Sequence, residues 1–261
     1  MKPVRAKKKL GQHFLTDLTI ARRIAETLDF QKYSNIIEIG PGMGVLTQFL
    51  VSETQSLNLV EIDSESVVYL KNTYDENQVN LIEGDFLKLD FKNTFGEEPF
   101  AIIGNFPYNI STQIVFKTLE NRDQIPFFSG MFQKEVAERI CEPPGSKKYG
   151  ILSVLTQLFY KTELLFHVPP QVFKPPPKVD SAVIRLVRKT DFHLDCDEVL
   201  LFQLVKLSFQ QRRKTLRNSL KTLNIPKMLT EDSIFDQRPE KLSGKDFVQL
   251  AKQIGHGNIS N

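Results

Sequence analysis

Four consecutive residues, Asn105, Phe106, Pro107 and Tyr108, carry groups that could position a nucleobase for chemistry. The side-chain carbonyl of Asn105 and the backbone carbonyl of Phe106, just before the proline, can both accept hydrogen bonds from one exocyclic amine. Such bonds hold the amine with its lone pair directed out of the ring plane, towards an electrophilic methyl group. Tyr108 is placed to stack on the base. The tetrapeptide therefore indicates group transfer to a base amine, with Asn105, Pro107 and Tyr108 in the catalytic site.

A glycine-rich turn supplies a second candidate, a nucleotide-binding site. An apolar stretch at residues 36–39 runs into Gly40, Gly42 and Gly44, the pattern of a buried strand, a tight turn and a helix. Glycine suits positions where φ is positive or where the backbone touches a ligand. A dinucleotide motif has the spacing G-x-G-x-x-G, whereas the spacing here suits a smaller adenosyl group. Glu38, just before the turn, could meet a cationic ammonium. Taken alone, the motif is equally compatible with an ordinary turn.

Four successive predicted strands each end in a residue that could hold this ligand, namely Gly40, Glu61, Asp85 and Asn105. Glu61 lies 61 − 44 = 17 residues beyond Gly44, where an acid can accept hydrogen bonds from both ribose hydroxyls. Asp85 could accept one from the adenine amine. Strands and helices alternate, so the pattern predicts a parallel, doubly wound sheet with the ligand at its carboxyl edge. The expected strands are residues 36–39, 57–63, 79–82, 100–104, 126–132 and 179–187, with helices near 17–28 and 111–119.

Prolines at positions 169–170 and 175–177 flank Phe173. They cannot lie inside a helix or a central strand, so the segment is a stiff, extended connection. It could hold Phe173 at the rim of the base pocket. The alternative is a rigid connector with Phe173 simply buried.

Two basic segments stand out against a net charge of only +3. Residues 1–23 carry 7 − 1 = +6 and residues 203–221 carry +6, which leaves 3 − 12 = −9 for the rest of the chain. This distribution suggests a polyanion-binding face, although either segment alone is compatible with a solvated surface. The candidate phosphate contacts are Lys7, Lys8, Lys9, Arg212, Arg213, Lys214 and Arg217, which would be RNA contacts if the polyanion is RNA.

The pattern beyond residue 188 is helical, with helices expected at 198–209, 211–223 and 245–254 and Ser243 capping the last. In the second of these, Arg213 and Arg217 would share a face. We therefore expect residues 1–187 to form the sheet domain and residues 188–261 a small all-helical domain that binds RNA.

The composition, with 41% hydrophobic and 25% charged residues in 261, is that of a soluble globular protein. Cys141 and Cys196 have neither a disulfide framework nor metal-ligand partners around them, so no metal is expected. No apolar run reaches transmembrane length, and the basic start lacks a signal-peptide core. We expect a cytoplasmic monomer with no membrane association.

The motifs together resemble the S-adenosylmethionine-dependent adenine amino-methyltransferases. Residues 10–15 (LGQHFL) and 172–183 (VFKPPPKVDSAV) narrow the resemblance to the ribosomal RNA adenine dimethyltransferases, over essentially the whole chain. The matching type dimethylates two adjacent adenosines near the 3′ end of small-subunit ribosomal RNA. His13 stands where many members carry Asn.

The resemblance implies a Rossmann-like methyltransferase sheet, S-adenosylmethionine as cofactor and the assembling small ribosomal subunit or its 16S RNA as partner. It implies that Phe173 covers the base opposite Tyr108, and that the cofactor site includes His13, Leu15, Gly40, Gly42, Glu61, Asp85 and Asn105. Because the amine edge of a paired base is inaccessible, the target must be single-stranded or extruded. Two alternatives remain, a large-subunit adenosine methyltransferase that confers antibiotic resistance and a non-catalytic ribosome-assembly factor.

Overall fold

The computed structural model describes the backbone of residues 4–259 and the side chains of residues 4–255. By internal contacts the chain divides into two compact units. The first extends through Ala137 and includes Thr162–Arg188, and the second comprises Glu138–Lys161 and the chain from Lys189 onward. The second unit thus takes in residues that precede the expected boundary at residue 188, and the assignment of two functional domains stays a prediction.

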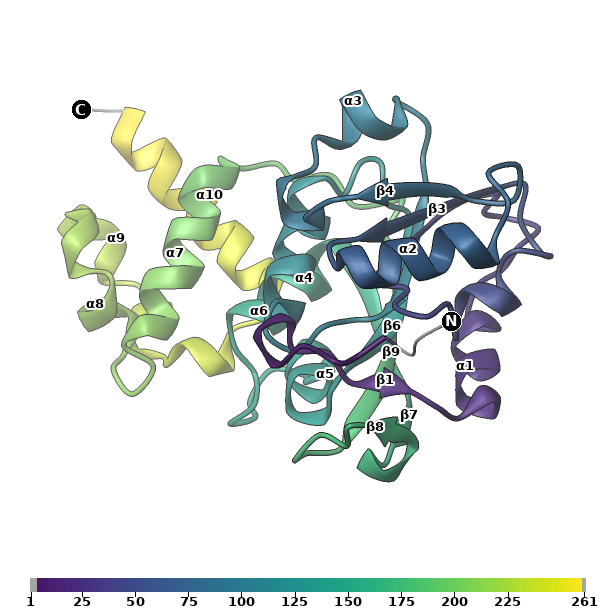
Figure 1. Ribbon diagram of the computed structural model, residues 1–261. Helices are drawn as coiled ribbons and strands as arrows, with labels where there is room; N and C mark the ends of the chain where they lie inside the picture. Colours follow the sequence, from purple (N-terminus) through teal and green to yellow (C-terminus); the bar gives the residue numbers. More distant parts are fainter. Residues whose placement is uncertain (1–3, 260–261) are drawn as a thin grey trace. The chain divides into compact units, whose positions relative to one another are not determined.

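A seven-stranded sheet in the order β4-β3-β2-β5-β6-β9-β7 forms the centre of the first unit (Figure 1). The run from β4 to β6 is parallel, and β9 is antiparallel to β6. The strands are β2 (Asn35–Ile39), β3 (Ser56–Glu61), β4 (Asn80–Glu83), β5 (Ala101–Asn105), β6 (Phe127–Gln133), β7 (Tyr160–Val168) and β9 (Ser181–Arg188). A separate antiparallel pair joins β1 (Phe14–Leu15) to β8 (Phe173–Lys174). The predicted α/β architecture with a mostly parallel sheet is confirmed.

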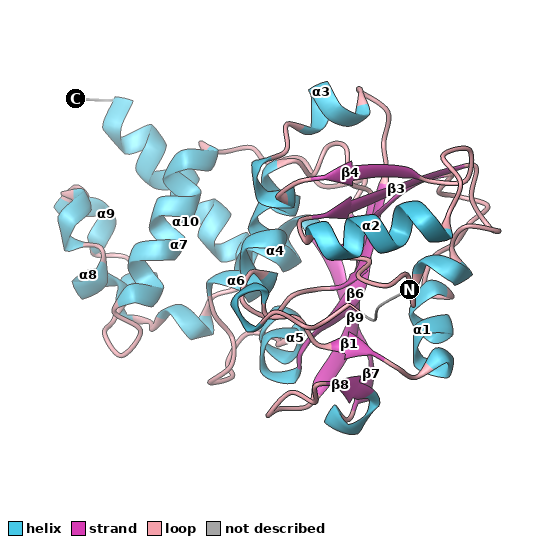
Figure 2. Ribbon diagram, in the orientation of Figure 1, coloured by secondary structure: helices cyan, strands magenta, loops and turns pink. Residues whose placement is uncertain are grey.

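Both faces of the central strands are buried, and their sequences are accordingly mostly apolar; the polar residues Glu38 in β2 and Asn58 in β3 are buried as well. Ile36 and Ile103 pack in a core cluster with α1 and α2 residues on one face, whereas their chain neighbours Ile37 and Ile102, which point the opposite way, are also fully buried. Helices therefore flank the sheet (Figure 2). In this part of the chain they are α1 (Leu18–Ala25), α2 (Ser64–Thr73), α3 (Phe91–Phe95), α4 (Ser111–Glu120) and α5 (Lys134–Cys141).

The first helix begins close to the position that the sequence predicts, with Asp17 as its N-terminal cap. Asp17 accepts hydrogen bonds from the backbone N–H groups of Thr19 and Ile20 at 2.8 and 3.1 Å, so α1 begins one residue later. The segment after Gly44 differs from the prediction, because it forms a 3-10 helix, η2 (Thr47–Phe49), instead of an α-helix. The buried Thr47 hydroxyl donates to Glu38 at 2.7 Å, which ties this tight turn to β2.

The second unit is helical in the part that the structure describes. Its helices are α6 (Ile151–Phe159), α7 (Glu198–Gln210), α8 (Leu216–Ser219), α9 (Lys227–Thr230) and α10 (Gly244–Ile259). The Ser243 hydroxyl accepts a hydrogen bond from the N–H of Asp246 at 3.3 Å, as expected of its cap. The predicted single helix over residues 211–223 is wrong. Thr215 is extended, and the N–H of Leu216 donates to Gln237 at 2.9 Å instead of continuing a helix from residue 212.

Candidate functional site

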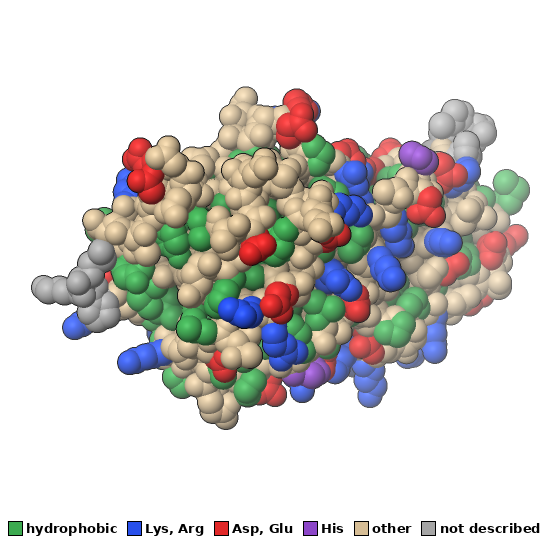
Figure 3. All heavy atoms as spheres, turned by 90° about the vertical axis from the view of Figure 1, so that its right-hand side faces the viewer, with side chains coloured by type: hydrophobic (Ala, Val, Ile, Leu, Met, Phe, Trp, Pro, Cys, Tyr) green, Lys and Arg blue, Asp and Glu red, His purple; other side chains and the backbone are tan. Residues whose placement is uncertain are grey.

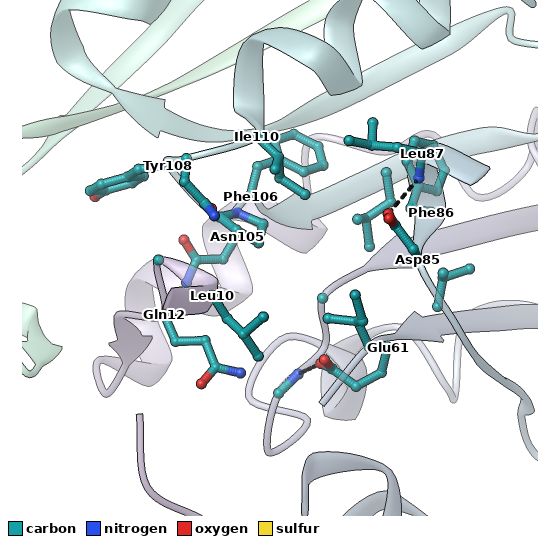
Figure 4. A pocket seen from close by; sticks show the side chains of 18 of the residues that line it. Leu10, Gln12, Glu61, Asp85, Phe86, Leu87, Asn105, Phe106, Tyr108 and Ile110 are labelled. Carbon is teal, nitrogen blue, oxygen red and sulfur yellow. Dashed lines mark hydrogen bonds between the residues drawn. The ribbon is translucent and has the colours of Figure 1, made fainter. Parts of the chain in front are cut away.

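A cavity of about 260 Å³ lies in the first unit, at the carboxyl ends of β2, β3, β4 and β5. This volume is close to the lower end of the roughly 300–1,000 Å³ typical of small-molecule sites. Figure 4 shows Glu61 and Asp85 on one side of the cavity and Asn105 and Tyr108 on another, with Leu10 and Gln12 completing the wall. The expectation that one sheet edge gathers Gly40, Glu61, Asp85 and Asn105 is thus met by the geometry.

The glycine turn forms one wall of this cavity. Gly40, Gly42 and Gly44 have φ values of 65°, 58° and 76°, in the left-handed region that favours glycine. A Cβ on Gly42 would lie 3.0 Å from the ring of Phe14, and one on Gly44 would lie 2.9 Å from the hydroxyl of Tyr74. A side chain at either position would therefore be strained and crowded, and the backbone itself faces the space.

Glu61 ends β3 with its side chain almost fully buried, at 3% exposure. One carboxylate oxygen accepts the N–H of Gly42 at 3.0 Å, and the other accepts the N–H of Asp63 at 2.8 Å. Burial raises the pKa of Glu61, although these two hydrogen bonds oppose the shift. Each oxygen can accept more than one bond, so the carboxylate is fixed in place and retains acceptor capacity towards the cavity.

Asp85 follows β4 and lines the same cavity. Its Oδ1 accepts the N–H of Leu87 at 3.0 Å, which fixes the side chain at the start of a 3-10 helix (Figure 4). Ile62 also lines the cavity and is 51% exposed. An exposed isoleucine beside a carboxylate suits the face and the amine edge of a purine. No sequence pattern singles out Ile62 as a cavity residue, although it directly follows Glu61.

Asn105 is oriented by the N-terminal segment. Its Nδ2 donates to the backbone carbonyl of His13 at 3.1 Å, so its Oδ1 remains the acceptor available at the cavity. The next residue, Phe106, is 1% exposed and stacks on Phe128 with ring centroids 4.9 Å apart. A Cβ at Gly104 or Gly130 would come within 2.9 Å or 2.5 Å of the Phe106 ring. These two glycines of β5 and β6 therefore make the recess that anchors the Asn-Phe-Pro-Tyr loop.

Tyr108 and His13 lie together at the cavity. Their ring centroids are 5.3 Å apart, and the Tyr108 hydroxyl is hydrogen-bonded to the buried hydroxyl of Ser181. His13 Nδ1 lies 2.8 Å from the carbonyl oxygen of Pro175. Burial raises the pKa of Tyr108, so the phenol is neutral at physiological pH and presents a ring and not a charge.

Phe173 does not cover the cavity. It is 4% exposed and belongs to the hydrophobic core, together with Leu15 at the same exposure. The cause is the antiparallel pairing of β1 and β8, which places Leu15 directly opposite Phe173. The structure thus has Phe173 buried on a rigid connector, the alternative to a ring that covers the base. The side chain of Leu15 does not line the cavity either.

Glu38 is also placed differently from its expected role. Its side chain is fully buried at 1% exposure and does not line the cavity, so it does not meet a ligand ammonium. Burial raises its pKa to about 8, against the hydrogen bond from Thr47. Glu38 is therefore a neutral, structural acid below that pH.

The candidate RNA contacts separate into two groups. Lys7 pairs with Asp63 and Glu65, and Arg217 pairs with Asp236 at 2.8 Å and donates to the carbonyl of Thr230. Because of these intramolecular partners, Lys7 and Arg217 do not have the free side chains expected of phosphate contacts. Arg212 is half-buried and donates to the carbonyl of Ser146 at 3.0 Å. The candidates with exposed side chains are Lys8, Lys9, Arg213 and Lys214.

Charges of both signs are mixed over the surface shown in Figure 3, with no segregation into one basic and one acidic side. Among the side chains of residues 4–255, no group of three or more histidines, cysteines, aspartates or glutamates could hold a metal ion. In the same range, no helix has the length and apolar character needed to span a bilayer.

Comparison with known proteins places these features in a family. A profile described as "Ribosomal RNA adenine dimethylase" matches residues 4–254. A protein of Flavobacterium johnsoniae named "Ribosomal RNA small subunit methyltransferase A" is 59% identical over 254 residues, which cover 97% of each chain. A protein of the same name from Bacteroides thetaiotaomicron is 55% identical over 257 residues, covering 97% of this chain and 96% of its own.

Two solved structures are similar over most of the chain. A dimethyladenosine transferase from Plasmodium falciparum aligns with a TM-score of 0.78 and 27% identity, covering 94% of this chain and 98% of its own. The 23S rRNA methyltransferase ErmE aligns with a TM-score of 0.68 and 26% identity, covering 92% of this chain and all of its own. Both alignments extend beyond the sheet into the helical C-terminal part.

Proposed function

Because the chain belongs to the ribosomal RNA adenine dimethylase family, we propose that it transfers two methyl groups from S-adenosylmethionine to the N6 amine of adenosine in small-subunit ribosomal RNA. The substrate is a pair of adjacent adenosines near the 3′ end of the 16S RNA. The observation that carries the chemistry is the Asn105 carboxamide, whose nitrogen is bound to His13 so that its oxygen serves the cavity.

The cavity residues fit an adenosyl cofactor. Side chains at Gly40 and Gly42 would be strained by φ values of 65° and 58°, so the backbone can approach a ligand there. Glu61 retains acceptor capacity for two ribose hydroxyls, and Asp85 and Ile62 suit the amine and a face of adenine. A cavity with these acceptors and this apolar side chain suits a nucleoside bound along its length.

S-adenosylmethionine supplies, when bound, a methyl group on a positively charged sulfur that an amine nitrogen can attack without a metal. In the first transfer, the Asn105 side chain and the carbonyl of Phe106 accept the two amine hydrogens of adenine and thereby orient the nitrogen lone pair. The chain contributes alignment and electrostatic stabilisation at the nitrogen as positive charge develops there. A strong general base is not required, because the proton can leave after transfer.

Tyr108 stacks on the adenine in this proposal. Its hydroxyl is held by Ser181, which restricts the ring to one orientation at the cavity. Stacking on an aromatic ring requires an unpaired base, so the target adenosines are in a loop or are extruded. Lys8, Lys9, Arg213 and Lys214 supply phosphate contacts from their exposed positions. A ribosomal substrate places the activity in the cytoplasm.

Transfer of a radiolabelled methyl group tests the function. The purified protein should label small ribosomal subunits from a strain that lacks these methyl groups, and should not label large-subunit RNA. Asn105→Ala should react about 10²- to 10³-fold more slowly at saturating cofactor and RNA, because it removes alignment at the reacting nitrogen. Asn72→Ala, on the exposed side of α2, is the matched control and should react at the normal rate.

Label appearing in large-subunit RNA alone would contradict the substrate assignment. It would favour an activity like that named for ErmE. An Asn105→Ala enzyme with an unchanged rate would remove the proposed role of its carboxamide.

A further inference from the structure

The N-terminal segment, residues 7–14, forms a wall of the cavity without belonging to the sheet. Leu10, Gly11, Gln12, His13 and Phe14 all line the cavity. The segment's regular structure consists of a 3-10 turn at Lys8–Leu10 and the start of the two-residue strand β1. Because backbone hydrogen bonds of a helix or sheet hold little of it, side chains must fix its position.

One end of the segment is fastened to the loop that follows β3. The Lys7 ammonium donates to Asp63 and lies 3.0 Å from a carboxylate oxygen of Glu65. Gln12 completes this network, since its Nε2 donates to Asp63 at 3.0 Å while its Oε1 accepts the backbone N–H of Lys7 at 2.8 Å. Asp63 in turn donates its N–H to Glu61 at 2.8 Å. Lys7 therefore connects the segment to the carboxylate that holds the proposed ribose.

The other end is fastened to the loop that presents the base. The carbonyl of His13 accepts the Asn105 amide at 3.1 Å. Gly11 packs against Asn109 so closely that a Cβ would lie 2.5 Å from its side-chain oxygen, and its φ of 64° is left-handed. The segment thus spans the cavity from the ribose side to the amine side, and displacing it would open the space between them.

The Lys7 pair differs from an ordinary surface salt bridge. The Asp63 side chain is fully buried, with 0% exposure, and that of Lys7 is 27% exposed. Burial alone would raise the pKa of Asp63, but the hydrogen bonds from Lys7 and Gln12 outweigh it and hold the pKa below its ordinary value. Removing one partner of such a pair leaves a buried charge poorly compensated. In contrast, the neighbouring side chains of Lys8 and Lys9 are exposed.

We propose that Lys7 is a positioning residue for cofactor binding, and not a phosphate contact. Its bond to Asp63 holds residues 10–13 against the cavity and so prolongs the residence of S-adenosylmethionine. Phosphate contacts of the segment come from Lys8 and Lys9 instead. This inference rests on the proposed function.

The test compares Lys7→Met with Lys8→Met, which removes the same charge one residue away. Calorimetry with S-adenosylhomocysteine measures cofactor-site affinity without any RNA. Lys7→Met should raise the dissociation constant about tenfold, the effect of losing one charged hydrogen bond, mainly through faster release. Lys7→Arg keeps the charge and should restore most of the affinity. Glu65→Gln removes only the outer, exposed partner and should show a smaller change in the same direction.

RNA binding gives the complementary readout. Lys8→Met should leave the S-adenosylhomocysteine affinity unchanged and reduce the salt dependence of RNA affinity by about 0.7 to 0.9 units of slope. Lys7→Met should leave that slope unchanged, and in methylation assays should raise KM for the cofactor with little change in kcat.

The outcomes separate the two proposals. Wild-type protein that binds S-adenosylhomocysteine with an affinity that Lys7→Met does not alter overturns the assignment of Lys7 alone. A reduced salt slope in Lys7→Met would identify a phosphate contact and overturn it as well. Wild-type protein that does not bind S-adenosylhomocysteine would overturn the proposed function together with this inference.

Discussion

Replacing Glu61 by glutamine changes the cofactor site at its most constrained carboxylate. The two oxygens of Glu61 accept the N–H groups of Gly42 and Asp63 at 3.0 and 2.8 Å. Glutamine keeps only one oxygen acceptor, and its NH₂ group would face a backbone N–H donor. The variant therefore weakens the bonds proposed for the ribose hydroxyls and also disturbs the turn that carries Gly42.

The loss of a charge-assisted hydrogen bond costs about 1.5 to 3 kcal/mol. At about 1.4 kcal/mol for each tenfold change, Glu61→Gln should raise the dissociation constant of S-adenosylmethionine about 10- to 150-fold. The unpaired backbone donor should in addition lower the free energy of unfolding by about 1 to 3 kcal/mol. Affinity for RNA should change little, because Glu61 is buried.

Calorimetric titration with the cofactor measures the first effect and urea unfolding the second. Glu83→Gln is the matched control, because Glu83 is the exposed residue directly opposite Glu61 in the register of β3 and β4. It should bind the cofactor normally. Unchanged affinity in Glu61→Gln, with the protein still folded, would refute the assignment of Glu61 to the ribose.

Glu38, Phe173 and Arg217 have surroundings that differ from those expected from the sequence, and variants at these positions should behave accordingly. The free energy of unfolding of the wild type, relative to that of Glu38→Gln, should fall as pH rises from about 5 to 8, by up to about 1.4 kcal/mol per pH unit. The reason is that the raised pKa of about 8 keeps Glu38 protonated in the folded protein while it ionises in the unfolded chain; parallel curves of stability against pH would contradict this. Phe173→Ala should lower the free energy of unfolding by about 3 to 5 kcal/mol, whereas Tyr108→Ala should slow single-turnover methylation about five- to 150-fold through the loss of about 1 to 3 kcal/mol of stacking. A Phe173→Ala protein of normal stability that methylates as slowly as Tyr108→Ala would show that Phe173 stacks on the base. Arg213→Gln should reduce the salt slope of RNA affinity by about 0.7 to 0.9, and an equal reduction in Arg217→Gln would show that the ion pair with Asp236 does not hold in solution.

The sequence was most informative where local pattern and chemistry coincide. A short apolar run in the sequence predicts a parallel strand buried on both faces. The carboxyl ends of such strands meet at one edge of the sheet, and for this reason Gly40, Glu61, Asp85 and Asn105 line one cavity. The glycine spacing likewise requires positive φ, which the structure has at all three positions. These inferences need only the order of the strands along the chain.

Long-range pairing accounts for the changed assignments of Phe173, Leu15, Lys7 and Arg217. The positions of Phe173 and Leu15 depend on a two-residue strand pair between segments 158 residues apart (173 − 15), which no local pattern encodes. The partners of Lys7 and Arg217 lie 56 and 19 residues further along the chain. The sequence does not show whether a basic side chain faces solvent or a carboxylate. The exposed and the paired cations could therefore be distinguished only in the structure.

Dimethylation of adjacent adenosines in the small-subunit RNA should depend on this chain in the cell. Mapping N6-methylated adenosines by mass spectrometry in ribosomal RNA from a strain in which the gene is deleted tests it most directly. We expect the deletion to remove both methyl groups from each of two adjacent adenosines near the 3′ end of the 16S RNA, and a plasmid copy to restore them. An Asn105→Ala copy should restore them poorly. Full dimethylation at this position in the deletion strain would contradict the account.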